Sequence, residues 1–358
     1  MAASLRSLDR SHCADLRILW SDFEVYLHRF LSMNKHSLIP TLAVCILLLL
    51  GGNVLMARWS RHLPYCQKLE SIRLAQDPDV LFVGNSLLDS RIDAVALNKG
   101  GALRGVSFTP LNAALGGSDA YDQALTAQYA IQCHAGIRTL VVGFFDFQLT
   151  DQRRVKPLDL TGNHMVAIDG RFPVSEVAAI YHFNAVEAGE LRMLRAVPMA
   201  ANRANVWKYV ELVRRSMGDV GMPHQAKSSM GRGADFAALE ADSPQSFDTR
   251  AEAFLQDSSH FNTSYEHLFA EAEQAHMRIV LVVMPMSPDH RSRFYARPAW
   301  KEYLRTLREL SQQRGFSMID AEDWMPDADE FSDALHMTMP AASDFSYRVG
   351  AELSHTNE

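Results

Sequence analysis

The strongest constraint on this chain is a stretch of 21 residues without a charged side chain, SLIPTLAVCILLLLGGNVLMA, between His36 and Arg58. At about 1.5 Å of rise per residue, a helix of this length crosses the roughly 30 Å hydrocarbon core of a bilayer. The stretch is apolar on every face, which disfavours a helix buried in a soluble core. A cleaved signal peptide is also disfavoured, because 36 residues precede the stretch and no small-x-small cleavage site follows it. We predict a membrane anchor over residues 37–58.

The anchor divides the chain into an N-terminal tail, residues 1–36, and a long remainder. Residues 59–78 are interpreted as a connector with helical character, and residues 79–352 as one domain. The chain has 358 residues, of which 47% are hydrophobic, enough for a domain with a proper core. Its formal net charge of −7 and its isoelectric point of about 6.1 argue against a nucleic-acid partner.

Short apolar runs alternate with helical patterns along the predicted domain. Continuous apolar runs are typical of strands buried on both faces of a parallel sheet, and DVLFVG is the clearest example. The alternation predicts an α/β fold of three layers, with helices on both faces of a parallel sheet. The strands are expected within residues 79–84, 105–115, 138–147, 278–285 and 316–320.

About 130 residues separate the third expected strand from the fourth, too many for a single crossover helix. Much of this stretch has a helical pattern, and part of it is rich in Gly, Ser and Pro. We therefore predict a largely helical insertion at about residues 150–262, which would form a lid or a wall of the substrate site.

The first strand stops abruptly in DVLFVGNSLLDS, where Ser86 follows Gly84 and Asn85. Ligands of open α/β sheets bind at the carboxyl ends of the strands. We expect Ser86 to begin a helix, where free backbone N–H groups and the helix dipole favour a developing anion. A serine there either caps the helix or attacks a carbonyl group while its own N–H holds the oxyanion.

A nucleophilic serine needs a base, and the base needs an acid that orients it. Asp333 and His336 lie three positions apart in FSDALHMTMPAA, between the last expected strand and the last helix. This order places the pair at the same edge of the sheet as Ser86, with Asp333 on one ring nitrogen and Ser86 facing the other. Gly117 follows the second strand and is either a second oxyanion donor or a plain turn residue.

These motifs, in this order, resemble those of the SGNH (GDSL-like) hydrolase superfamily. Gly-x-Ser is followed by Asn-x-x-x-x-Gly, a third strand ending in Gly-x-x-Asp and a late Asp-x-x-His. More narrowly, the chain resembles the membrane-anchored cell-envelope and exopolysaccharide branch, including the DltD-like group. The resemblance covers about residues 79–147 and 262–352, and it implies a flavodoxin-like sheet order.

The resemblance assigns roles to individual residues. Ser86 is the expected nucleophile, His336 the general base and then acid, Asp333 the residue that orients it, and Gly117 an oxyanion donor. The third motif departs from the family pattern, because Phe145 stands where an asparagine amide would donate to the oxyanion. Losing such a donor can cost about 2.7–4 kcal/mol of transition-state stabilisation.

Two other residues bear on the predicted oxyanion site. Asn85 replaces the more usual aspartate and is a candidate substitute for the missing amide donor. Asp146 either lines the substrate pocket, holds the Ser86 segment or is a structural residue at the edge of the core.

The implied reaction is acyl transfer on an ester through an acyl-serine, either as an esterase or as an O-acyltransferase. The implied substrate is a cell-surface or exopolysaccharide glycan, with a membrane acyl-donor protein as a partner. Basic residues flank the anchor on both sides and do not set its orientation. The implied function, rather than the charge pattern, therefore places the domain on the extracytoplasmic (periplasmic) side. The alternative is a non-catalytic glycan-binding or assembly protein of polysaccharide export, which Phe145 favours.

No metal motif, phosphate-binding glycine-rich loop or dinucleotide fingerprint occurs in the sequence, so no metal and no cofactor are expected. Two of the four cysteines, Cys66 and Cys133, fall in the extramembrane part. If that part is exported, these two are able to form a disulfide, a question that the sequence leaves open.

Overall fold

The computed structural model describes residues 35–152, 154–160, 166–203, 243–256 and 260–355. Nearly all of the predicted tail, residues 1–36, lies outside the described residues, as does the 204–242 part of the predicted insertion. The chain divides into two compact units, Met1–Ala57 and Arg58–Glu358. The division falls at the end of the predicted anchor, and the predicted connector belongs to the second unit.

Helix α2 (Lys35–Ser60) contains the uncharged stretch. Its segment Ile39–Ser60 is long and apolar enough to cross a bilayer, and none of its most apolar part is buried by protein. Leu48 and Leu55, for example, each expose 70% of their surface. Among the described residues no other helix meets this test. Side chains this apolar and this exposed need a lipid or protein environment, which is consistent with anchoring.

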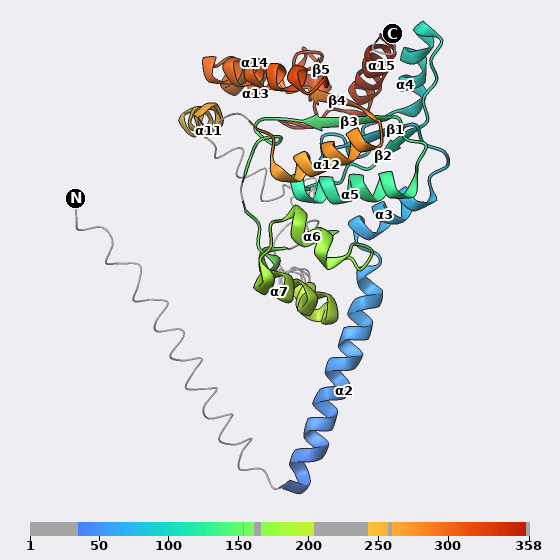
Figure 1. Cartoon of the computed structure of the whole chain (residues 1–358), viewed down its shortest axis with the longest axis vertical. Coiled ribbons are helices and arrows are strands. Elements are labelled where there is room, and N and C mark those ends of the chain that lie inside the picture. The colour runs from blue at the N-terminus through green and yellow to red at the C-terminus, as the bar shows by residue number, and fades with distance from the viewer. Residues whose placement is uncertain (1–34, 153, 161–165, 204–242, 257–259, 356–358) are drawn as a thin grey trace, which may run out of the picture. The chain divides into compact units, whose positions relative to one another are not determined.

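The second unit is built on a parallel sheet with the strand order β2-β1-β3-β4-β5 (Figure 1). This order and the helices on both faces confirm the predicted α/β class. All five strands overlap the predicted ranges: β1 (Val80–Val83), β2 (Pro110–Asn112), β3 (Thr139–Phe144), β4 (Arg278–Val283) and β5 (Ser317–Asp320). Strand β1 pairs with β2 on one side and β3 on the other, so the chain changes direction across the sheet at β1. Sites in such sheets form at this point, beyond the carboxyl ends of the strands.

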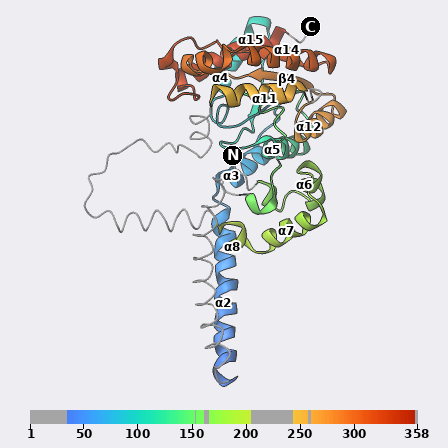
Figure 2. The same cartoon turned by 90° about the vertical axis from the view of Figure 1, so that its left-hand side faces the viewer.

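Helices cover both faces of the sheet, as Figures 1 and 2 show. Helices α3, α5 and α12 lie on one face, and α4, α14 and α15 lie on the other. The main helices of this unit are α3 (Pro64–Leu74), α4 (Ala94–Gly101), α5 (Ala120–Cys133), α6 (Val174–Ile180), α7 (Ala185–Ala196), α11 (Pro244–Gln256), α12 (Thr263–Gln274), α14 (Pro298–Gln313) and α15 (Met339–His355). The shorter turns are η1 (Ala102–Arg104), η2 (Pro157–Asp159), α8 (Pro198–Ala201), α13 (Pro288–His290), η4 (Arg291–Tyr295) and η5 (Ala328–Glu330).

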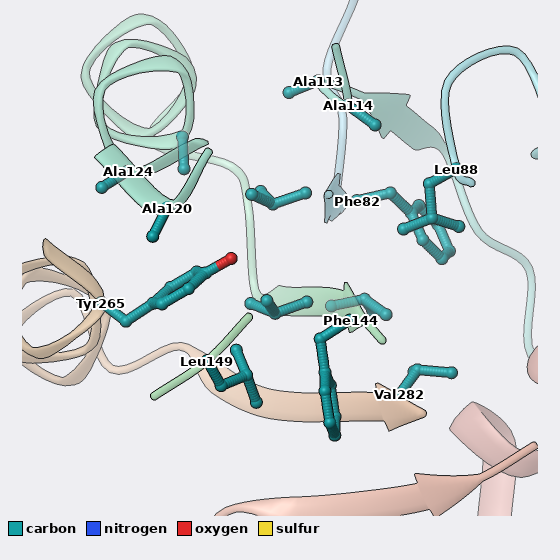
Figure 3. Packing of buried hydrophobic residues seen from close by; sticks show 14 of the residues in the cluster. Phe82, Leu88, Ala113, Ala114, Ala120, Ala124, Phe144, Leu149, Tyr265 and Val282 are labelled. Carbon is teal, nitrogen blue, oxygen red and sulfur yellow. The ribbon is translucent and has the colours of Figure 1, made fainter. Parts of the chain in front are cut away.

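The core lies between the sheet and its helices. Small residues of α5, such as Ala120 and Ala124, belong to the same buried cluster as the large Tyr265 of α12, whose ring is turned toward the strands in Figure 3. Phe82 and Phe144, on the neighbouring strands β1 and β3, are completely buried. Burying one such side chain contributes about 1.5–3 kcal/mol, so this packing holds the strand ends in place. The predicted connector contributes to the same core through α3.

The described part of the insertion is helical, as predicted. Helices α6, α7 and α8 precede residues 204–242, and α11 follows them. Helix α7 begins with a capping box, in which the Asn184 side chain accepts from the N–H of Glu187 while the Glu187 carboxylate accepts from the N–H of Asn184. Helix α11 packs against α14. The expected lid or substrate wall stays a prediction.

Candidate active site

Ser86, His336 and Asp333 are joined by hydrogen bonds beyond the carboxyl ends of β1 and β5. The Ser86 Oγ atom lies 2.9 Å from His336 Nε2. On the other side of the ring, His336 Nδ1 lies 3.0 Å from Asp333 Oδ1 and 2.9 Å from Asp333 Oδ2. The fold thus brings together a hydroxyl, an imidazole and a carboxylate from positions 250 residues apart. This is the geometry of a nucleophile, its base and the group that orients the base.

The charge of Asp333 fixes which ring nitrogen carries the proton. Partial burial works against ionisation of Asp333. Hydrogen bonds from the His336 ring and from the backbone N–H groups of His336 and Leu335 outweigh it and hold the pKa of Asp333 below its usual value. An ionised carboxylate only accepts hydrogen bonds, so Nδ1 of His336 must be the donor. In the neutral ring Nε2 is then an acceptor, and it faces the Ser86 hydroxyl.

The segment that carries His336 is tightly built. Asp333 Oδ1 accepts the N–H of Leu335 at 2.9 Å and the N–H of His336 at 2.8 Å, which explains the three-residue spacing. Phe331 and Met337 form an antiparallel bridge across the turn, and both are buried. The polar contacts of Asp333 and the buried bridge between Phe331 and Met337 therefore hold the imidazole in place.

Ser287, which follows β4, ties this segment to the sheet. Its Oγ donates to the carbonyl oxygen of Ala334 at 2.6 Å, and it also accepts from the N–H of His290 at 3.3 Å. In the sequence, Ala334 lies between Asp333 and His336. The sequence gives no signal for this contact, because it joins a serine to a backbone carbonyl 47 residues away.

Ser86 lies in a turn rather than at the start of a helix, so the expectation of a helix there is wrong. The backbone N–H groups of Leu88 and Asp89 donate to the carbonyl oxygen of Asn85 at 3.1 and 3.0 Å, which makes one helical turn. The next helix, α4, begins only at Ala94, where the Asp93 side chain caps it. The turn still leaves the N–H of Ser86 outside the sheet ladder, as a helix start would.

The Leu88 side chain packs this turn against the sheet, at two positions where glycine leaves space for it. A Cβ atom on Gly84 would lie 2.9 Å from Leu88 Cδ1, and one on Gly143 would meet the same Leu88 atom and lie 2.9 Å from Met284 Sδ. Leu88 is only 1% exposed, so its side chain cannot move away freely. These glycines, at the ends of β1 and β3, therefore admit the side chain that holds the Ser86 turn.

Two backbone N–H groups bear on the predicted oxyanion site. Within the described part of the chain, the N–H groups of Ser86 and Gly117 have no hydrogen-bond partner. Gly117 has a φ of 73°, in the left-handed region that glycine adopts without strain. The preceding Gly116 packs against Ser86, since a Cβ atom on it would be 3.8 Å from Ser86 Cβ. The role of Gly117 as a donor stays a prediction.

Asn85 points its amide toward the segment after β3. Its Oδ1 accepts the N–H of Leu87 at 3.0 Å, and its Nδ2 donates to Gln148 Oε1 at 3.3 Å. Asn85 is buried, with 9% of its surface exposed. The amide therefore links the Ser86 turn to its neighbour, and a further role as oxyanion donor stays a prediction. Gln148 is a member of this environment that sequence reasoning did not identify.

Asp146 makes its contacts on the β4 side of the sheet edge. Its Oδ1 accepts from the Tyr295 hydroxyl at 3.0 Å and lies 3.1 Å from His290 Nε2, while its N–H donates to the Tyr295 oxygen at 3.1 Å. Burial, and then the charge of Asp146, raise the pKa of Tyr295 well above its usual value, so the phenol keeps its proton. These contacts agree with the structural alternative for Asp146. Neighbouring Phe145 packs partly buried against the core.

Cys66 and Cys133 are both free thiols in this structure. Among the residues that the structure describes, no three His, Cys, Asp or Glu side chains gather as a metal-binding group.

Comparisons with known proteins give only weak likeness. No family model matches the chain, and no curated protein matches it. Among solved structures, it is similar to a "putative acylhydrolase" of Bacteroides fragilis NCTC 9343, at 10% identity and a TM-score of 0.37, covering 81% of this chain and 95% of that one. It is also similar to a "GDSL-like lipase" of Bacteroides thetaiotaomicron VPI-5482, at 9% identity and a TM-score of 0.35, covering 81% and 96%. Likeness of this degree assigns no family, and the site must be judged on its own geometry.

Proposed function

We propose that this chain is a membrane-anchored serine enzyme that transfers acyl groups from esters, with Ser86 as its nucleophile. The observation that carries the proposal is the continuous contact from the Ser86 hydroxyl through His336 to the Asp333 carboxylate. A serine hydroxyl is a weak nucleophile unless a base is positioned to take its proton. Ser86 is only partly buried, so a substrate carbonyl has a route to it.

The reaction follows from the positions of these atoms. The Ser86 oxygen attacks the ester carbonyl, its proton passes to His336 Nε2, and the carbonyl oxygen becomes an anion facing the N–H groups of Ser86 and Gly117. Collapse breaks the ester bond, and the leaving alcohol takes the proton from Nε2. An acceptor hydroxyl then gives its proton to Nε2 and attacks the acyl-serine. The bond between the acyl group and Ser86 breaks, and the Ser86 oxygen takes the proton back from Nε2. Asp333 stays ionised throughout and stabilises the imidazolium.

Water and a sugar hydroxyl are both suitable acceptors for this arrangement. The finer proposal is an esterase or O-acyltransferase that acts on a cell-surface or exported polysaccharide on the periplasmic side. Helix α2 supports the membrane tether, since its apolar residues lie exposed in the protein. The glycan substrate and the membrane acyl-donor partner rest on the motif resemblance alone.

The decisive experiment is active-site labelling of the full-length protein in detergent with a fluorophosphonate probe. We expect the wild type to be labelled on Ser86, with Ser86→Ala and His336→Ala unlabelled. Ser292→Ala is a suitable control, because Ser292 is exposed and only donates to the carbonyl oxygen of Asp289. A folded wild type without label would favour the non-catalytic glycan-binding alternative.

A second assay separates hydrolysis from transfer. The purified protein receives p-nitrophenyl acetate with and without an oligosaccharide, and the products are identified by mass spectrometry. Acetylated sugar would establish transfer, whereas free acetate in both reactions would indicate an esterase.

A further inference from the structure

A salt bridge joins helix α3 to the Ser86 turn, which in turn contacts the glycine turn, Gly116-Gly117, after β2. Lys68 Nζ, on α3, lies 3.0 Å from Asp89 Oδ1, three residues beyond the nucleophile. The other oxygen of the same carboxylate, Oδ2, accepts the N–H of Gly116 at 3.1 Å. The Lys68 side chain is 17% exposed and the Asp89 side chain 30%, so the pair is more sheltered than an ordinary surface pair. One carboxylate thus connects helix α3, the Ser86 turn and the turn after β2.

Further hydrogen bonds join the same segments at Asn112, ahead of the two glycines. Lys68 Nζ also donates to the carbonyl oxygen of Asn112 at 3.4 Å, and Asn112 Nδ2 donates to the carbonyl oxygen of Leu88 at 2.8 Å. The segment from Asn112 to Gly117 is therefore attached to the Ser86 turn at both ends. Backbone bonds from Ala113 to Phe82 and from Leu115 to Gly84 also hold this segment, and Asp89 and Lys68 add the contacts at its two ends.

The contact to Asp89 distinguishes the two neighbouring glycine N–H groups. Asp89 takes the N–H of Gly116 as a partner, while the next N–H, that of Gly117, has none in the described part of the chain. A Cβ atom on Gly116 would lie 3.4 Å from Asp89 Oδ2, so the carboxylate packs directly on this peptide. Fixing Gly116 in this way restrains the next peptide unit, which carries the N–H of Gly117.

The charge of Lys68 matters as well as its position. A lone carboxylate beside an oxyanion site would repel the negative charge that develops there, and such interactions are strong where water is partly excluded. Lys68 offsets the charge of Asp89 at a distance of 3.0 Å. Asp89 can therefore hold the turn with little cost to the oxyanion.

We propose that Asp89 is a positioning residue for the oxyanion-binding turn and that Lys68 holds Asp89 in place. The inference rests on the proposed serine chemistry, because the turn is positioned for an anion formed at Ser86. It predicts that disrupting the pair slows the bond-forming step and leaves binding of the reagent unchanged.

The test is the kinetics of fluorophosphonate labelling in the full-length protein, with kinact and KI measured separately. Asp89→Asn keeps the shape but replaces one acceptor oxygen with an NH2 group, which then faces a donor, either Lys68 or Gly116. We expect kinact to fall about 10- to 100-fold, the scale of a weakened oxyanion donor, with KI within twofold of wild type. Lys68→Met should lower kinact in the same direction, and Lys68→Arg, which keeps the charge, should restore most of it.

A matched control is the pair formed by Arg314 and Glu266, at 2.8 Å and with side-chain exposures of 28% and 33%. Glu266→Gln breaks this pair on α12, away from Ser86, and should leave kinact unchanged. Labelling of Asp89→Asn at the wild-type rate, or a change confined to KI, would overturn the inference while leaving the proposed function intact. A folded but unlabelled wild type would overturn both. If Asp89→Asn fails to fold, the contrast between Lys68→Met and Lys68→Arg decides the same question.

Discussion

A single oxygen atom of Asp333 accepts hydrogen bonds from both the imidazole and the backbone N–H of His336, at 3.0 and 2.8 Å. The carboxylate that orients the ring therefore also fixes the peptide that carries the ring. The neutral tautomer with its proton on Nδ1 is selected by the same contact, because an ionised carboxylate cannot donate. Asp333 thus sets both the orientation of the His336 ring and the ring nitrogen that carries the proton. Substitution of Asp333 tests both effects.

Asp333→Asn should abolish most of the activity while leaving the fold intact. The amide can still accept a backbone N–H, but its NH2 group can donate to Nδ1 and would favour the tautomer with the proton on Nε2, which cannot take the proton of Ser86. Loss of the correct tautomer in a serine–histidine–aspartate site costs about 10⁴-fold in rate. The measurement is the labelling rate with a fluorophosphonate, together with thermal unfolding. A variant labelled within tenfold of the wild-type rate would show that Asp333 does not set the tautomer.

The depressed pKa of Asp333 predicts how stability depends on pH. A carboxyl group with a lower pKa in the folded state stabilises the fold above its unfolded pKa, which is about 3.9, and this contribution is lost as pH falls through the folded pKa. The difference in free energy of unfolding between wild type and Asp333→Asn should therefore be constant above about pH 5. It should shrink steadily below about pH 4. Urea unfolding of both proteins from pH 3 to pH 7 checks this, and a difference that grows toward low pH would contradict it.

The strands were predictable because the sequence pattern and the burial pattern coincide. Strand β3, with TLVVGF buried at every position, reads as a continuous apolar run, as a central parallel strand should. Strand β2 is only three residues long and carries a proline, so its signal is weak, and a longer range was predicted than is found. Its position at the edge of the sheet tolerates both features.

The candidate site was predictable only where its residues carry a local signal. Ser86 follows an apolar run and Asp333 lies three positions before His336, so both stand out in the sequence. The contacts of Asp89 with Lys68 and of Ser287 with Ala334 have no such signal, because they join groups brought together only by the folded sheet. The orientation of the Asp146 side chain likewise depends on its hydrogen bond with Tyr295, 149 residues away. Pairings of this kind follow from the tertiary structure and have no fixed sequence spacing.

Gly143→Ala should both destabilise the domain and disturb the Ser86 turn. The added methyl group would overlap Leu88, which is 1% exposed and has no free space to enter. Overpacking of this kind costs about 1–3 kcal/mol. Urea unfolding should show the loss, and fluorophosphonate labelling should slow, because Leu88 lies two residues from Ser86.

The control for this substitution is Gly170→Ala, since a methyl group at Gly170 would meet no atom within 4 Å. Combining Gly143→Ala with Leu88→Ala should give a smaller total destabilisation than the sum of the two single changes, because the second change removes the overlap. Strict additivity would mean that the methyl group is accommodated elsewhere.

Cys66 should react slowly with alkylating reagents in the folded protein. Burial, together with the nearby Asp169 carboxylate 3.7 Å from its sulfur atom, raises the pKa of the Cys66 thiol. Less of the reactive thiolate is then present at a given pH, and the half-buried position also restricts access.

Cys133 is exposed and provides an internal comparison. With iodoacetamide at pH 8.5 and peptide mass spectrometry, we expect Cys133 to be modified at least about tenfold faster than Cys66. In 8 M urea the two rates should converge, because unfolding removes both the burial and the neighbouring charge. Equal rates in the folded protein would show that the Cys66 environment does not protect its thiol.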